Sequence, residues 1–84
     1  MSTQLYTISI FTENFIGLLH RVTSIFTRRK LNIESISASE SEVKGIYRYT
    51  ISLKTTKDKA EHVVQQLEKQ VDIFKALVHE EDET

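Results

Sequence analysis

The feature that most constrains this chain is a change in the spacing of its apolar residues, which alternates between a strand period and a helix period. In residues 4–12, Tyr6, Ile8 and Ile10 alternate with polar neighbours, which predicts a half-buried strand. The next apolar residues recur at every third or fourth position, which predicts an amphipathic helix with its apolar face turned inward. They are Leu18, Leu19, Val22, Ile25 and Phe26. Asn14 stands just ahead of them and suits an N-cap.

The middle of the chain predicts two strands joined by a hairpin. Residues 31–41 read as extended, and the slip between Ile33 and Ile36 indicates a bulge or a change of face. A hairpin connection follows at 42–45, where Gly45 supplies the permissive backbone. The third strand alternates cleanly, and its inward face should comprise Tyr47, Tyr49, Ile51 and Leu53.

A second amphipathic helix and a last strand complete the pattern. Thr55 or Thr56 caps the helix, and its buried stripe should comprise Ala60, Val63, Val64 and Leu67. The last strand is expected over residues 71–78. We therefore predict one domain over residues 1–79, followed by an acidic, solvated tail over residues 80–84.

This order of elements restricts the fold to the α+β class. Right-handed crossovers and a tight hairpin favour a four-stranded antiparallel sheet of order 4-1-3-2 with both helices on one face. Strands two and four are then the edges. Strand two carries little charge between Ile33 and Ser39, so we expect a second copy to pair with it. The residues of this predicted dimer edge are Ile36, Ser37, Ala38 and Ser39.

Composition excludes several classes of function. The 84 residues carry 11 basic and 12 acidic side chains, which argues against a dedicated binder of nucleic acid or anionic membranes. No cysteine is present, which removes thiolate chemistry. The histidines are scattered, without the spacing of a metal site. With no apolar run long enough to span a bilayer and no signal-peptide pattern, we expect a cytoplasmic protein.

The segment from Glu13 to Gly17 is the place where a small anion could bind. It joins the first strand to the first helix, and a helix start offers N–H groups and the positive end of the dipole to a carboxylate. Gly17 would let a ligand approach the backbone closely. An asparagine cap with a glycine kept for packing would explain the same residues, so this segment alone leaves both interpretations open.

Two linked motifs bring a resemblance to a known family. Glu-Asn-x-x-Gly-x-Leu at residues 13–19 and Arg-x-x-Asn-Ile-Glu-Ser at residues 29–35 resemble the ACT domain of the acetolactate synthase small subunit. The resemblance implies a ferredoxin-like fold, side-by-side dimers through strand two, and a branched-chain amino acid, usually valine, bound between two protomers. It also implies that the helix exit, where the family often has glycine, is managed here by Lys30.

The resemblance implies roles for individual residues. Asn14 and Gly17 of one protomer and Asn32 of the other would hold the carboxylate and ammonium of the effector, which backbone amides and carboxamides suit chemically. The remaining residues at this implied effector site are Phe15, Ile16, Leu18 and Ile33, of which Ile16, Leu18 and Ile33 could form apolar walls.

The implied function is regulatory and non-catalytic. Catalysis would belong to a separate large subunit of acetolactate synthase that carries thiamine diphosphate and magnesium, with no cofactor in this chain. Small subunits of the family usually continue into a second domain, whereas this chain stops at Thr84. We therefore expect a small subunit or a fragment of one, with a stand-alone amino-acid sensor without an enzyme partner as the alternative. An RNA-recognition motif has the same element order, but the tyrosines of strands one and three share the expected core face here.

Overall fold

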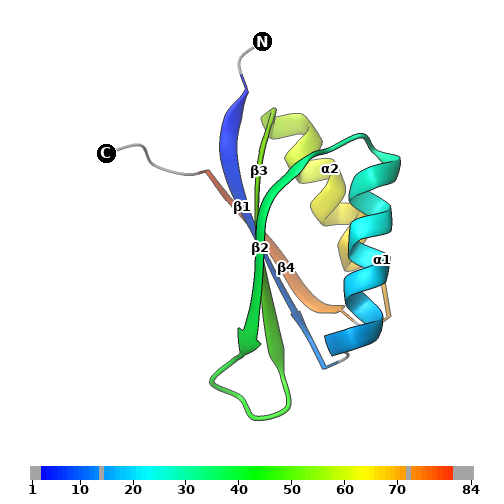
Figure 1. Ribbon diagram of the computed structural model, residues 1–84, viewed down its shortest axis with the longest axis vertical. Helices are drawn as coiled ribbons and strands as arrows, with labels where there is room; N and C mark the ends of the chain where they lie inside the picture. The colour runs from blue at the N-terminus through cyan, green and yellow to red at the C-terminus, as the bar shows by residue number, and fades with distance from the viewer. Residues whose placement is uncertain (1–2, 14, 72, 81–84) are drawn as a thin grey trace.

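The computed structural model describes residues 3–13, 15–71 and 73–80, with Phe15 and Ile16 described by their backbone alone. Six elements follow one another in the predicted order (Figure 1). They are β1 (Gln4–Thr12), α1 (Phe15–Arg28), β2 (Ile33–Glu40), β3 (Tyr47–Thr55), α2 (Lys57–Glu68) and β4 (Ile73–Glu80).

The four strands form one antiparallel sheet in the order β2-β3-β1-β4. This is the predicted order read from the other edge, so the α+β, ferredoxin-like arrangement is confirmed. Both helices lie on the same face of the sheet, and the opposite face is open (Figure 1). Strands β2 and β4 are the two edges.

The core lies between the sheet and the helices. The alternation in β1 and β3 buries the side chains of Tyr6 and Tyr49 on the helix-covered face, together with the aliphatic residues that share their phase. The predicted stripe of α2 is buried as expected. Because both tyrosines face the helices, they do not form the open stacking platform by which RNA-recognition motifs bind RNA.

The exit from α1 is closed by a non-glycine residue, as predicted. Lys30 adopts a positive φ of 60°. Its N–H donates to the carbonyl of Thr27 at 2.9 Å, and the Leu31 N–H donates to the carbonyl of Phe26 at 2.9 Å. This pair of hydrogen bonds is the Schellman motif, and both Leu31 and Phe26 are buried beside it. The motif fixes where the chain turns toward β2.

Strand β2 is shorter than predicted, because Leu31 belongs to the helix exit. The predicted bulge is confirmed, since the register with β3 shifts between Ile33 and Ser35. The hairpin to β3 is also confirmed. Gly45 has a φ of 89°, and its N–H donates to Oε2 of Glu40 at 3.0 Å.

The predicted bounds of the last strand were wrong by two residues at each end. Val71, predicted to begin the strand, is 94% exposed in a turn that follows α2. The Gln70 N–H donates to the carbonyl of Leu67 at 3.0 Å, and the Ile73 N–H donates to the carbonyl of Gln70 at 3.2 Å. The chain needs this turn to return from helix to sheet. Glu80, assigned to the tail by sequence, ends β4, and residues 81–84 lie outside the described part.

Candidate functional site

The first half of the predicted effector site lies at the start of α1. Gly17 is exposed in the first turn of this helix, which contains no acidic side chain to oppose an anion. The positive end of the helix dipole is therefore directed toward any carboxylate placed there. Asn14 lies outside the described residues, as do the side chains of Phe15 and Ile16. The described part of this site thus presents helix backbone and a residue without a side chain.

The second half lies at the start of β2. Asn32 is exposed between the helix exit and the strand, and Ile33 is half-buried at the first strand position. Leu18, the other predicted apolar wall, is fully buried in the core. Of the three predicted wall residues, Ile16 has a side chain outside the described part and Leu18 is buried, so Ile33 is the one with a described and accessible side chain. Next to it, the Asn32 carboxamide has both a donor and an acceptor to offer a ligand.

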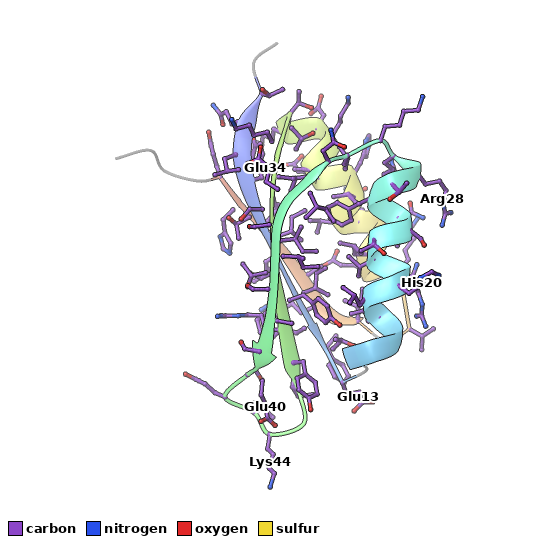
Figure 2. The ribbon with its side chains drawn as sticks, in the orientation of Figure 1. Glu13, His20, Arg28, Glu34, Glu40 and Lys44 are labelled. Atoms are coloured by element: carbon purple, nitrogen blue, oxygen red, sulfur yellow. The ribbon has the colours of Figure 1, made fainter. Side chains whose placement is uncertain are left out.

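These two halves lie at opposite ends of the molecule, because helix α1 separates them. Figure 2 shows Glu13, before α1, and Glu40, at the end of β2, at one end of the molecule, with Arg28 and Glu34 at the other. The 14 residues of α1 separate the two ends by roughly 20 Å, given a rise of about 1.5 Å per residue. A single copy therefore cannot bring both halves to one small molecule.

The predicted dimer edge is open to a second copy. All residues of β2 after Ile33 are exposed, including the predicted edge residues Ile36, Ser37, Ala38 and Ser39. The side chain of Ile36 pairs with that of Ile51 across the ladder, on the helix-covered side, yet it is 39% exposed. Strand β2 and helix α1 lie together on the side nearest the viewer in Figure 1.

Leu19 adds to this edge, although the sequence placed it in the core. Arg28 of α1 and Gln66 of α2 line the same cavity, so the flank of α1 that carries Arg28 faces α2. Leu19 is nine positions before Arg28, so at about 100° per residue it points roughly 180° away, toward the β2 side. It is 43% exposed. The apolar stripe of α1 is wider than the sheet can cover. This width is the feature of the sequence that indicates an exposed position at the edge of the stripe, where Leu19 lies.

The described residues show no sign of a metal or redox centre. They contain no group of three or more His, Cys, Asp or Glu side chains that could hold a metal ion. His20, His62 and His79 are all exposed. Burial raises the pKa of the Tyr49 phenol above its ordinary value of 10.0. Within the described ranges, neither helix combines the length and apolar character needed to cross a membrane.

Comparison with known proteins places this arrangement in a family. A family model described as the AHAS small subunit-like ACT domain matches residues 8–75. The acetolactate synthase small subunit of Mycolicibacterium smegmatis is 35% identical over 80 residues, covering 95% of this chain and 47% of that protein. A probable acetolactate synthase small subunit of Methanothermobacter thermautotrophicus is 40% identical over 75 residues, covering 89% of this chain and 45% of that protein.

Solved structures agree with the sequence relatives. The acetolactate synthase small subunit of Thermotoga maritima superposes with a TM-score of 0.79 at 31% identity, covering 95% of this chain and 48% of that one. The ACT domain of a GTP pyrophosphokinase from Chlorobium tepidum, at 21% identity and a TM-score of 0.77, shares the fold. The chain spans about half the length of the small subunits it matches.

Proposed function

This chain belongs to the family of AHAS small subunit-like ACT domains, and on that premise we propose that it is a regulatory, non-catalytic domain of acetolactate synthase. It binds a branched-chain amino acid, most suitably valine, where two copies meet. Occupancy of this site is passed to a large catalytic subunit that carries thiamine diphosphate and magnesium, as feedback inhibition.

The observation that carries the proposal is the separation of the two half-sites along the molecule. Strand β2 begins at the end where α1 finishes and finishes at the end where α1 begins (Figure 1). Antiparallel pairing of two β2 edges therefore brings the start of one β2 next to the start of α1 in its partner. Exposed Ile36 and Leu19 would be buried in the same contact, which favours the association.

The chemistry of the combined site suits a zwitterion with an aliphatic side chain. The carboxylate meets the first turn of α1 near Gly17 and the carboxamide of Asn14. The ammonium meets the carbonyl oxygen of the partner's Asn32 side chain, and Ile33 contacts the aliphatic group. Neither pole of the ligand then requires a buried charged side chain, whose desolvation would cost free energy.

Feedback inhibition requires that the amino acid bind one state of the assembly more tightly than another. A ligand that contacts two copies at once discriminates between such states, because any rotation of one copy against the other separates the two half-sites. The large subunit would favour the state in which the half-sites are apart. Binding of the amino acid would then shift the assembly away from the state in which the large subunit is active.

A thermal-shift screen across the twenty amino acids tests the site. An amino acid present at about one hundred times its Kd should stabilise the chain by roughly 2.7 kcal/mol, which is a rise of several degrees in Tm for a domain of this size. Asn32→Ala and Asn14→Ser should remove the response, and serine keeps a capping oxygen at the helix start. Gln65→Ala, which truncates an exposed carboxamide on α2, is the matched control and should respond as the wild type does.

The outcomes separate the regulatory proposal from the stand-alone sensor. A valine response with co-purification of a large catalytic subunit supports the regulatory domain. A valine response without any such association supports the sensor. A response that persists in both asparagine variants contradicts the assigned site, whatever the partner.

A further inference from the structure

The end of α1 and the first turns of α2 both lie toward the end of the molecule where β2 begins (Figure 1). Two adjoining cavities, of about 190 and 290 Å³, share Arg28 and Arg29 in their walls. Lys59 and His62 of α2 complete the larger cavity, and Gln66 borders the smaller one. No acidic side chain of the described residues lines either cavity.

Lys59 and His62 lie on a different flank of α2 from Glu61. Lys59, His62 and Gln66 follow one another at spacings of three and four residues, so they share the flank that faces α1. Glu61 lines a different cavity, against β1 and β4, together with Tyr6 and Val78. Lys59 and His62 are thus directed toward the basic end of α1, whereas Glu61 is directed toward the other cavity, which Lys57 also lines.

The helix dipoles account for only half of this arrangement. Arg28 and Arg29 stand at the C-terminal end of α1, where positive charge is favourable. Lys59 stands in the first turn of α2 beside Asp58, at the positive end of the helix dipole, where positive charge is unfavourable, and His62 stands in the second turn. The helix dipole therefore accounts for the basic residues on the α1 side of this cleft and not for Lys59 on the α2 side.

One guanidinium is already held in position. Nη2 of Arg29 donates to Oε1 of Gln66 at 3.0 Å, which links the two helices across the cleft. This hydrogen bond occupies one donor of a group that has five, and it orients the others. A bound anion would then meet a partly ordered donor fork, and the entropic cost of binding would be smaller.

We propose that this cleft, lined by Arg28, Arg29, Lys59 and His62, binds a small molecule bearing phosphate groups. The inference does not depend on the amino-acid site. The guanidinium groups offer the bidentate geometry that phosphate oxygens accept, and the N-terminal half of α2 adds its positive dipole end. The small size of the two cavities, about 190 and 290 Å³, favours a compact phosphate ligand over an extended acidic segment of another protein.

Titration of the full chain with sodium pyrophosphate tests this site. Backbone amide shifts are followed by NMR at a fixed ionic strength of about 150 mM, so that general screening is constant. We expect saturable shifts confined to residues 28–31 and 59–66. Arg28→Gln combined with Lys59→Gln should weaken binding by about tenfold or more, because two charge-assisted contacts are lost.

The matched control removes two positive charges elsewhere. Lys54→Gln combined with Lys75→Gln alters exposed lysines of β3 and β4 and should change the pyrophosphate affinity by less than about twofold. Equal weakening by both pairs, or shifts spread over the whole surface, would overturn the proposal. So would binding of hexaglutamate in this cleft without binding of pyrophosphate, which would identify a surface for an acidic protein segment. Arg28→Gln and Lys59→Gln tested singly, with Tm measured for each, separate loss of binding from loss of folding.

Discussion

The two edges of the sheet differ in what covers them. Strand β4 lies beside α2, buries Ile73 and Ala76, and carries Lys75, His79 and Glu80 along its length. Strand β2 has no buried residue, and between Glu34 and Glu40 its residues are uncharged. Charged side chains on an edge strand discourage pairing with another sheet. Thus β4 carries charges that protect an edge although it also exposes Phe74 and Leu77, whereas the uncharged stretch of β2 presents its backbone beside Ile36.

The difference indicates which edge a second copy would pair with in the proposed dimer. Ile36 and Leu19 are exposed, and their burial against a partner would contribute about 25 cal/mol for each Å² of apolar surface. The open edge also borders Asn32 and Ile33. The proposed ligand site and the proposed dimer contact are therefore parts of one surface, so a change in either should affect the other.

The largest expected effect comes from placing a charge on each edge in turn. Ile36 and Leu77 are aliphatic residues of similar exposure, 39% and 37%, on β2 and β4. Ile36→Lys should raise the Kd for self-association by at least about tenfold, roughly 1.4 kcal/mol, because a lysine at the contact must be desolvated. Leu77→Lys should leave it unchanged. Sedimentation velocity over a range of concentrations measures both, and equal behaviour of the two variants would contradict the assignment of the dimer to β2.

The next effect concerns how β2 is held at its C-terminal end. Gly45, in the hairpin after β2, has a φ of 89°, and a Cβ placed there would meet no atom within 4 Å. Gly45→Ala should therefore cost about 1–2 kcal/mol through backbone conformation alone. Urea unfolding measures this cost. Ser41→Ala, at the other side of the same loop, removes the hydroxyl that accepts from the Val43 N–H at 3.2 Å, and it tests whether that hydrogen bond contributes less than the glycine.

A smaller effect of opposite sign is expected at the N-terminal end of β2. Lys30 is the described non-glycine residue with positive φ, so Lys30→Gly should stabilise the chain by about 0.5–1 kcal/mol. Lys30→Ala removes the same charge without relieving the backbone and should not stabilise it. If alanine and glycine raise Tm equally, charge rather than backbone strain is responsible. The described residues flanking β4 contain no such positive-φ position, so these variants probe the β2 edge specifically.

Much of the fold could be predicted, because the spacing of apolar residues and the residue types in turns depend on neighbouring positions in the sequence. The slip between Ile33 and Ile36 correctly indicated the bulge, and Gly45 marked the hairpin. Val71 was misplaced because a β-branched residue resembles the start of a strand, while the turn that holds it depends on where α2 ends. Leu19 was misplaced because the number of apolar positions that a sheet can cover is a tertiary property.

One of the two candidate sites could be predicted from the sequence, and the other could not. Asn14 and Asn32 could be selected from sequence because their spacing forms a linked motif. The basic cleft could not, because it depends on how α1 and α2 are rotated about their axes. In the sequence alone, the positive charges of Arg28 and Arg29 are explained by their position at the C-terminal end of a helix. Only the packing places Lys59 and His62 across the cleft from them.

The smallest effect at neutral pH is expected at Tyr49, which connects the interior to the β2 edge. Its backbone pairs with Ala38 of β2 on one side and with Ile10 of β1 on the other. Burial raises the pKa of its phenol above 10.0, so the folded state keeps this proton to higher pH than the unfolded state does. Below pH 10 the phenol is neutral in both states, and its contribution to stability is fully present. Above pH 10 the free energy of unfolding should fall, by at most about 1.4 kcal/mol per pH unit for one proton.

Tyr49→Phe should reduce this alkaline slope, because phenylalanine has no proton to lose. The difference between the two unfolding curves from pH 9 to pH 11 isolates the contribution of Tyr49 from that of the lysines, which titrate in both proteins. Hydrogen exchange at Ala38, followed over the same range, shows whether the loss is transmitted to β2. An unchanged slope in Tyr49→Phe would mean that ionisation of the buried phenol is not what lowers the free energy of unfolding above pH 10.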